Sequence, residues 1–512
     1  MRLALTGGLV ADGTGSEPRP GTVVVEDGRV SAVLSPGEPV ADAGVIDAAG
    51  NIVAPGFIDL HSHADFSLGS SPAAESQLTQ GVTTLVAGNC GWSPFPVTDL
   101  EALRAGTAFL GPKHDWSWID LAGFAATVEP AVNLALQVGH CTLRIAAMGS
   151  AQRPPSRTEL RTMQDLLREA ADQGAVGFST GLIYAPGTYA SPEEVAALVA
   201  TAAECGLLYS THIRNEGAGL LTALDEAIVA ARAGGARLEI SHLKAVGTSN
   251  YGLVGAALER LDAVDDVDLG WDAYPYTATS TTLTTRLPAW ALAGGTLLER
   301  LADRAERARI ADALRADVLL SPDTVVIASL PPGRYEDCRG LSLAEIARRD
   351  DVDAAEIVLR ILEEHQAAVS VVNHAMSEED VTTVLEHPRT AIASDGWIMD
   401  ATGPGHPHPR NFGTFPRVLG HYARDRGLLT LAEAIRRMTS LPASRLGWCD
   451  RGVIKPGAIA DLVVLDPQQI ADKSTYDDPW QLSVGVHHVV LAGRSALVAG
   501  EPTGLRAGRV LT

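Results

Sequence analysis

The sequence predicts an α/β fold: a (β/α)8 TIM barrel with a small β-sandwich domain formed by both chain termini and an inserted lid segment. Through the middle of the chain, short β-branched runs alternate with stretches rich in Ala, Leu, Glu and Arg, which is typical of βα units in a parallel sheet. At both ends, apolar and polar residues alternate between tight turns, which indicates short antiparallel strands. A length of 512 residues accommodates both parts.

The two ends of the chain are predicted to build one β domain, over residues 1–54 and 440–512. Near the N-terminus the turns contain Asp-Gly and Gly-Gly pairs, which favour hairpins. Near the C-terminus, strands are expected at 461–465 and 486–492. Because chain termini often lie close together, the two segments are expected to share one sheet.

The catalytic barrel is predicted over residues 55–286 and 340–439. Its eight strand places have nine candidates, whose carboxyl ends lie at His63, Asn89, His140, Thr180, His212, His242, Asp272 or Tyr274, His374 and Asp395. Either 266–274 or 368–374 is the seventh strand, and the earlier segment is favoured. All these strand ends meet at one mouth, where barrel active sites are built.

Residues 287–339 are predicted to form an insertion. This segment is longer than a βα connection needs, and its pattern indicates a helix of its own at 295–314 and a strand at 324–329. We expect it to lie over the barrel mouth as a lid.

The charge balance limits the partners. The chain has 62 acidic residues against 40 Lys plus Arg, a formal net charge of −22, which argues against nucleic acid because phosphate binding needs a clustered cationic surface. No apolar run approaches the roughly 20 residues that span a bilayer, so no membrane association is expected. Gly7 and Gly8 interrupt the N-terminus before a signal segment forms. The predicted location is the cytoplasm. The composition does not report the oligomeric state.

The cysteines are few and scattered. Five in a chain of this length, an odd number, make a disulfide framework improbable. They lie at Cys90, Cys141, Cys205, Cys338 and Cys449. At least one thiol therefore needs its own explanation.

His61 and His63 close the first predicted barrel strand, in the segment 56–63 (GFIDLHSH). Side chains alternate along a strand, so both imidazoles point to one face, where they can hold one cation. The alternative is a pair of imidazoles satisfied by hydrogen bonds at a strand end. The motif alone is weak evidence for a metal site.

Three further residues lie at strand ends. Cys90 follows the next strand in the segment GNCG, and His212 and His242 each end a β-rich run, thirty residues apart, which is about one βα unit. Singly, each is more often an ordinary buried side chain. Jointly, four histidines and one cysteine around one mouth favour a metal site, since imidazole and thiolate are the ligands that zinc prefers.

Asp395 ends the final predicted strand, between Ser394 and Gly396. Viewed alone, this carboxylate could be a loop cap. Beside a zinc-bound water it has a specific role, because it can accept the proton of the attacking water and pass it to the leaving nitrogen.

At these residues the sequence resembles the amidohydrolase superfamily and, within it, the N-acyl-D-amino-acid deacylases, or D-aminoacylases. The superfamily features are the His61-x-His63 pair, His212, His242, Asp395 and the segment 452–462 (GVIKPGAIADL). The deacylase group is marked by the segments 88–91 (GNCG), 177–187 (GFSTGLIYAPG), 272–276 (DAYPY) and 408–417 (HPRNFGTFPR). The resemblance covers nearly the whole chain.

The lysines test this resemblance. Hydantoinase-like and urease-like relatives bridge two metals with a carboxylated lysine at the end of the fourth barrel strand. Here that strand, 176–182, contains no lysine. The chain has four lysines: Lys113 in a polar loop, Lys244 beyond the sixth strand, and Lys455 and Lys473 in the terminal β region. A lysine-bridged centre is therefore not expected, and the resemblance to the deacylases implies Cys90 as the substitute.

The resemblance implies a zinc enzyme. It implies one tight Zn²⁺ site at Cys90, His212 and His242, and a second, weaker position lined by His61 and His63. It also implies a small-molecule N-acyl amino acid as substrate, with the D preference taken from the resemblance only.

Other residues acquire substrate roles through the same resemblance. Lys244, Tyr276 and Arg410 are the candidate clamp for the substrate carboxylate, with Tyr274 open as an alternative to Tyr276. Tyr184 is expected to donate a hydrogen bond to the developing oxyanion. Arg286 is either a specificity residue or a solvated side chain, and it is not assigned.

The predicted reaction is zinc-dependent hydrolysis of the amide bond of N-acyl-D-amino acids, with Asp395 as proton carrier. Two classes of alternative remain. One is another amidohydrolase, acting on cyclic imides or hydantoins or as a dipeptidase on C-terminal D-residues, and the other is an inactive scaffold homologue. The complete set of ligands with Asp395 argues against an inactive homologue.

Overall fold

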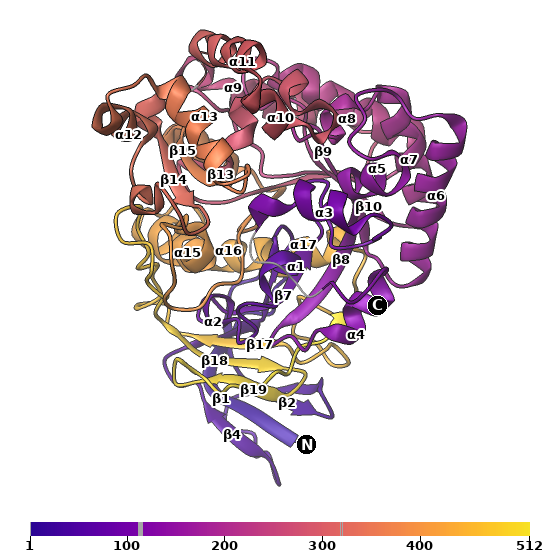
Figure 1. Ribbon diagram of the computed structural model, residues 1–512. Helices are drawn as coiled ribbons and strands as arrows, with labels where there is room; N and C mark the ends of the chain where they lie inside the picture. The colour runs from indigo at the N-terminus through magenta and orange to yellow at the C-terminus, as the bar shows by residue number, and fades with distance from the viewer. Residues whose placement is uncertain (1, 111–115, 318, 320) are drawn as a thin grey trace.

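We describe a computed structural model that covers residues 2–110, 116–317, 319 and 321–512. Lys113 lies outside the described residues. Figure 1 shows three parts: strands from both termini at the bottom, a barrel in the middle, and an inserted group of helices and strands at the upper left. Among the described residues, no helix has the combination of length and apolar character that crossing a membrane requires.

Eight parallel strands form the barrel, as predicted. Their order is β16-β12-β11-β10-β9-β8-β7-β6, and a parallel bridge between Ser62 and Gly396 joins the first strand end to the last. Every residue in these strands is buried, which is typical of a parallel sheet covered by helices. The strands are β6 (Phe57–Asp59), β7 (Val82–Ala87), β8 (Asn133–Gly139), β9 (Gly177–Gly181), β10 (Leu208–His212), β11 (Leu238–Ile240), β12 (Leu269–Ala273) and β16 (Thr390–Ile392).

The helices that surround the barrel have clear start and stop signals. Helix α6 begins with a capping box in which Ser156 and Glu159 bind each other's backbone amides. Helix α8 ends at Gly235, whose positive φ of 70° suits glycine. The helices of this layer include α5 (His140–Met148), α6 (Arg157–Asp172), α7 (Pro192–Glu204), α8 (Leu220–Gly234), α9 (Leu253–Asp262) and α14 (Glu378–Glu386).

Both ends of the chain contribute to one nine-stranded sheet, which confirms the predicted terminal β domain. Strand β17 from the C-terminal part pairs with β5 from the N-terminal part, so the two segments are joined by backbone hydrogen bonds. The strands are β1 (Arg2–Val10), β2 (Arg19–Glu26), β3 (Arg29–Leu34), β4 (Gly44–Asp47), β5 (Ile52–Pro55), β17 (Leu462–Leu465), β18 (Val486–Leu491), β19 (Arg494–Val498) and β20 (Glu501–Pro502).

The last strand, β21 (Val510–Leu511), lies outside this sheet and pairs with β8 of the barrel. Gly508 permits the approach, because a Cβ atom there would lie 2.2 Å from the backbone of Val132. The end of the chain therefore contributes to the barrel as well as to the β domain.

The inserted part has its own sheet, in the order β13-β15-β14, and its own hydrophobic core. Because β15 belongs to this sheet, β12 is the seventh barrel strand, as favoured above. The sheet reaches beyond the predicted insertion of 287–339 at both ends, since β13 and β15 pair along their full length. Its elements are β13 (Ala278–Thr282), α10 (Leu297–Ala302), α11 (Arg304–Ala316), β14 (Val325–Ser329), α12 (Leu343–Asp350), α13 (Ala354–Glu364) and β15 (Ser370–His374). The domain limits drawn from the sequence stay a prediction.

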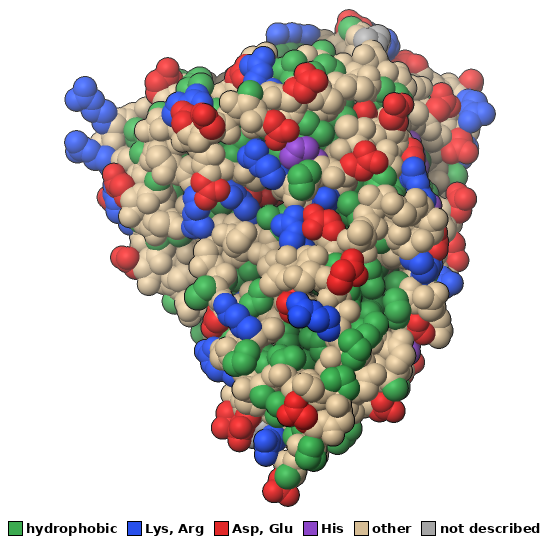
Figure 2. Space-filling view, turned by 180° about the vertical axis from the view of Figure 1, so that it is seen from behind, with side chains coloured by type: hydrophobic (Ala, Val, Ile, Leu, Met, Phe, Trp, Pro, Cys, Tyr) green, Lys and Arg blue, Asp and Glu red, His purple; other side chains and the backbone are tan. Residues whose placement is uncertain are grey.

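Charged side chains of both signs are mixed on the surface. On the face in Figure 2, Lys and Arg alternate with Asp and Glu. Many of these charges are paired, as in the bridge between Arg260 and Asp225 at 2.6 Å. Exposed pairs of this kind contribute little to the free energy of unfolding.

Candidate functional site

Six predicted site residues meet at the carboxyl ends of the barrel strands. Cys90 follows β7, His212 ends β10, His242 follows β11, and Asp395 follows β16. His61 and His63 follow β6, and all six side chains are buried. The residues that the sequence placed together are therefore adjacent in space.

Cys90, His212 and His242 form one cluster. The Cys90 sulfur lies 3.6 Å from His212 Nδ1 and 3.6 Å from His242 Nε2. A tetrahedral zinc ion with ordinary bond lengths separates a sulfur and a nitrogen ligand by roughly 3.6 Å. The donor types and their spacing therefore fit a zinc ion.

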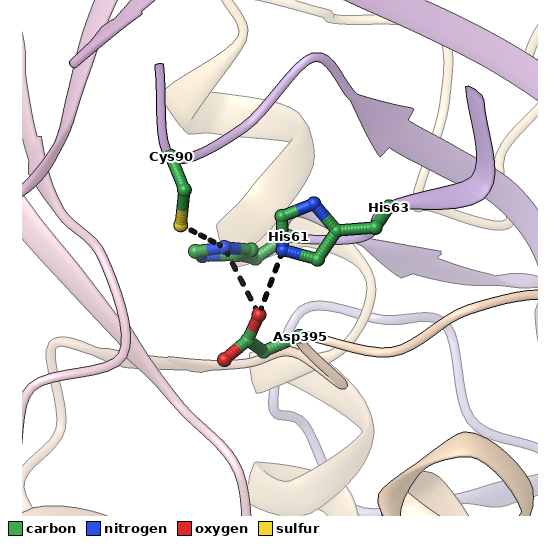
Figure 3. Close-up of side chains that lie close together, drawn as sticks. All are labelled: His61, His63, Cys90 and Asp395. Carbon is green, nitrogen blue, oxygen red and sulfur yellow. Dashed lines mark hydrogen bonds and ion pairs between the residues drawn. The ribbon is translucent and has the colours of Figure 1, made fainter. Parts of the chain in front are cut away.

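A second cluster shares the same thiol. His61 Nε2 lies 3.3 Å from the Cys90 sulfur and 3.4 Å from Asp395 Oδ1, and His63 Nε2 lies 3.1 Å from the same oxygen. In Figure 3 the two imidazoles and the carboxylate point toward one another. The ligand atoms of these four residues all lie within 4.8 Å, so a second cation position adjoins the first.

The backbone at the site is strained. Cys90, His242 and Asp395 have φ angles of 53°, 39° and 49°, a region that residues other than glycine adopt infrequently. Such conformations concentrate at functional sites, where the surrounding structure maintains them. Next to Cys90, Gly88 is required, because a Cβ there would lie 2.1 Å from the carbonyl oxygen of Gln137.

Burial sets the protonation of the clusters. Desolvation lowers the pKa of His61 to about 3 and holds the pKa values of His212 and His242 below their usual range, so all three imidazoles are neutral and able to bind a metal. Burial also raises the pKa of the Cys90 thiol well above its usual value. A bound cation is what favours its thiolate form.

Two carboxylates that the sequence analysis missed orient the histidines. Glu216 Oε1 lies 3.1 Å from His242 Nδ1, and Glu216 Oε2 lies 3.6 Å from His212 Nε2. Asp272 accepts a hydrogen bond from the backbone amide of His242 at 2.9 Å, and its other oxygen lies 3.4 Å from His61 Nδ1. Carboxylates of this kind fix the orientation of ligand histidines.

The sequence signal for these two carboxylates differs. Asp272 was visible as a polar residue at a strand end. Glu216 lies in the loop after β10, four residues beyond His212, where no motif marks it.

Asp395 is held by Arg410. The guanidinium donates a hydrogen bond to Asp395 Oδ2 at 2.7 Å, with both side chains almost fully buried. Burial alone raises the pKa of Asp395, but the charge of Arg410 is the largest opposing influence, and that pKa is held well below its ordinary value. The carboxylate is therefore ionised at neutral pH.

Lys244 and Arg410 both lie near one tyrosine ring. Lys244 Nζ is 5.7 Å and Arg410 Cζ 5.0 Å from the ring centre of Tyr274, distances that allow cation–π attraction. Lys244 also donates to Glu216 Oε1 at 2.6 Å. Tyr274 and the two cations line one cavity.

Tyr276 lies outside the cavity wall among the described residues, and its predicted substrate role stays a prediction. Its hydroxyl donates to the carbonyl of Pro409 at 3.4 Å, and its ring packs against Arg417, 5.0 Å away. Among the described residues that line the cavity beside the clusters, Tyr274 is present and Tyr276 is absent. The two tyrosines lie two residues apart, so the sequence pattern alone did not separate them.

The cavity beside the clusters has a volume of about 280 Å³. Tyr184 contributes to its wall, with its hydroxyl 3.1 Å from Thr281 Oγ1 and its ring 5.2 Å from that of His212. Arg286 lines the same cavity and forms an ion pair with Asp317 at 3.0 Å. The cavity is of a size that suits a small molecule.

Comparison with known proteins agrees with this geometry. A model of the amidohydrolase family matches residues 44–496. An N-acyl-D-glutamate deacylase of Alcaligenes xylosoxydans xylosoxydans is 37% identical over 100% of this chain and 96% of its own length. A D-aminoacylase of the same organism is 35% identical over 99% of this chain and 97% of its own.

Solved structures give the same result. The crystal structure of an N-acyl-D-glutamate deacylase from Bordetella bronchiseptica, complexed with zinc and a phosphonate mimic of the tetrahedral intermediate, has a TM-score of 0.84 at 36% identity and covers 99% of both chains. A D-aminoacylase structure has a TM-score of 0.86 at 34% identity over 100% of this chain and 99% of its own. A D-hydantoinase, with a TM-score of 0.56 at 14% identity over 100% of this chain and 98% of its own, shares the fold. The chain therefore belongs to the amidohydrolase family and, within it, to the N-acyl-D-amino-acid deacylases.

Proposed function

We propose that the protein hydrolyses the amide bond of N-acyl-D-amino acids, in a zinc-dependent reaction that releases a carboxylic acid and a free D-amino acid. The observation that carries this proposal is the meeting of a Cys-His-His cluster and Asp395 with Lys244 and Arg410 in one cavity. The cavity thus combines ligands for a metal with cations for a carboxylate. The named activities of the full-length relatives support the same reaction.

Cys90, His212 and His242 would hold the tight zinc ion, and His61 and His63 would line the weaker second position. Zinc supplies a water of lowered pKa and polarises the scissile carbonyl. The fourth strand, β9, reads GFSTG, so it offers no lysine to bridge two metals. The Cys90 thiol, which belongs to both clusters, would be the ligand available in its place.

Asp395 would move the proton. Its carboxylate is ionised at neutral pH because of Arg410, and Oδ1 faces both His61 and His63. Placed there, it accepts the proton released when water adds to the carbonyl, and it returns that proton to the leaving nitrogen. No separate general acid is needed.

Tyr184 would donate to the carbonyl oxygen as negative charge develops on it. Burial raises the pKa of Tyr184 well above its usual value, so the phenol keeps its proton throughout the reaction. A fixed donor of this kind is worth roughly 3 kcal/mol in the transition state.

Lys244 and Arg410 would bind the α-carboxylate of the substrate. Both are buried, at 4% and 3% exposure, and both line the cavity. The ring of Tyr274, which lies near both cations, would hold them in place, in the role first assigned to Tyr276. A buried carboxylate bound by two cations gains strong charge-assisted hydrogen bonds.

The cytoplasmic location also stays a proposal. It is supported by the cysteines, all five of which are free thiols, as is usual in a reducing compartment. The proposed partner is the small-molecule substrate.

The reaction class is tested with zinc-loaded protein, an N-acetyl-D-amino acid and a hydantoin. We expect release of the free amino acid from the linear amide and no ring opening. Asp395→Asn serves as the control for background hydrolysis, because it keeps the size of the side chain and removes the base. Ring opening without cleavage of the linear amide would overturn the proposal in favour of a cyclic amide hydrolase.

A further inference from the structure

A second, larger cavity opens from the first. It has a volume of about 1400 Å³, above the range of ordinary small-molecule pockets. The two cavities share part of their walls, including Trp92, Tyr184, Thr285 and Trp397. We call the larger one the vestibule, and it adjoins the site at the Tyr184 side.

The wall of the vestibule is mainly apolar, with serine and threonine side chains interspersed. Its walls include aromatic and aliphatic side chains, among them Phe66, Trp116, Leu287, Leu297, Leu330 and Trp480. Of the described residues that line it, only Arg104, Glu364 and Asp400 are charged, and all three are exposed to solvent. The charges therefore lie where the wall meets solvent, and the mainly apolar remainder suits a hydrocarbon.

The position of the vestibule relative to the metal clusters decides which part of a substrate enters it. Lys244, Tyr274 and Arg410 line the smaller cavity only, whereas Tyr184 lines both. A substrate with its α-carboxylate on the two cations and its carbonyl oxygen at Tyr184 directs the acyl substituent past Tyr184. That path leads into the vestibule.

The side chain of the amino acid meets different surroundings. The remaining walls of the smaller cavity carry the ion pair of Arg286 and Asp317, and neither residue lines the vestibule. The surroundings of the amino-acid side chain are thus charged and polar, and those of the acyl group are uncharged and mainly apolar.

We propose that the vestibule binds the acyl chain, and that the substrates of this protein carry long acyl groups. The inference rests on the proposed function and specifies its substrate class. An acetyl group would leave nearly all of the vestibule wall uncovered.

The first test compares two isomers, N-decanoyl-D-alanine and N-acetyl-D-2-aminoundecanoic acid, with N-acetyl-D-alanine as reference, all below their micelle concentrations. The isomers have equal apolar content and differ only in whether the chain is on the acyl or the amino-acid side. Each buried methylene is worth about fourfold in kcat/KM at most. If each of the eight additional methylenes is about half buried, kcat/KM for the decanoyl isomer is expected to exceed that of the reference by on the order of 100-fold.

The results separate this inference from the proposed function. Cleavage of all three compounds with no advantage for the decanoyl isomer, or with preference for the aminoundecanoic isomer, would overturn the acyl assignment and leave the deacylase function intact. Failure to cleave any of the three, by protein with full zinc content, would overturn the deacylase function itself.

A pair of variants tests whether the vestibule wall binds the acyl chain. Leu298 on α10 lines the vestibule and is 40% exposed, so Leu298→Asp should not disturb the core. We expect it to lower kcat/KM for the decanoyl substrate about tenfold and to leave that for N-acetyl-D-alanine unchanged. Val229→Asp on α8, 58% exposed and outside the vestibule, is the matched control and should change neither. An equal loss for both substrates in Leu298→Asp would contradict the assignment.

Discussion

Arg410 Nη1 donates a hydrogen bond to Asp395 Oδ2 at 2.7 Å, so the proposed binding cation and the proposed base are joined. Arg410 is the largest charge that lowers the pKa of Asp395. A substrate carboxylate on Arg410 would share this guanidinium and weaken its hold on Asp395. Substrate binding would then raise the pKa of Asp395 and make it a better base at the time when a proton is released.

Replacement of Arg410 tests this link through the pH profile. A lowered pKa keeps Asp395 ionised, and activity is lost as the pH falls through that value. In Arg410→Met the pKa rises, so the acid side of the kcat/KM profile should move to higher pH. Arg417→Met is the control. Arg417 lies on the same helix as Arg410, α15 (Arg410–Arg417), but pairs with Asp472 at 3.0 Å, so its loss should leave the acid side in place. An unmoved acid side in Arg410→Met would refute the link.

Removal of the shared thiol should remove the tight metal. We expect Cys90→Ala to lose most of its zinc, measured by elemental analysis after gel filtration, and to lose activity with it. Cys141→Ala is the matched control, because Cys141 is equally buried and free and lies outside both clusters. Full zinc content and activity in Cys90→Ala would exclude this residue as a ligand.

Glu216 should matter for zinc affinity. Its two oxygens face the outer nitrogens of both His212 and His242, and the loss of such a partner typically costs 10- to 100-fold in affinity, which is about the effect expected in Glu216→Gln. Zinc affinity is measured by competition with a chelator. Glu226→Gln, in which the altered carboxylate pairs with Arg214 at 2.8 Å, should keep the affinity of the parent protein. Parent-like affinity in Glu216→Gln would show that this carboxylate does not support the site.

Tyr274 should act through its ring. Its hydroxyl faces Met376 Sδ at 3.8 Å, whereas its ring centre lies 5.7 Å from Lys244 Nζ and 5.0 Å from Arg410 Cζ. Tyr274→Phe should therefore keep KM within about twofold, and Tyr274→Leu should raise KM by about 3- to 30-fold through lost cation–π attraction. Tyr276→Phe should leave KM unchanged. If Tyr274→Phe were as harmful as Tyr274→Leu, the hydroxyl would be the group that contacts the substrate.

The metal clusters were predictable because strand ends in a barrel converge on one mouth, whatever lies between them in sequence. His212 and Cys90 are far apart in the chain, yet each carries its own local signal at a strand end. Glu216 carries no such signal, since a carboxylate in a loop acquires its role only when the loop folds back over two histidines. The choice between Tyr274 and Tyr276 was not visible in the sequence for a related reason. The chain turns after β12, so residues two positions apart no longer lie on the same face.

The fold was predictable to a similar extent. Periodicity located the terminal strands and the barrel, and a count of candidates left β12 and β15 as the ambiguous pair. The pairing of β15 with β13 depends on contacts between segments almost one hundred residues apart, and periodicity does not report partners. The return of β21 to the barrel was equally invisible, because it depends on the approach of Gly508 to Val132.

The most direct test of the central claim is a comparison of enantiomers. Zinc-loaded protein is offered the D and L forms of one N-acyl amino acid, and the free amino acid is quantified with zinc content measured alongside. We predict release from the D form, loss of this release when zinc is removed by a chelator, and recovery when zinc is returned. Release from the L form alone, or release from the D form that is unaffected by complete removal of zinc, would contradict the proposed function.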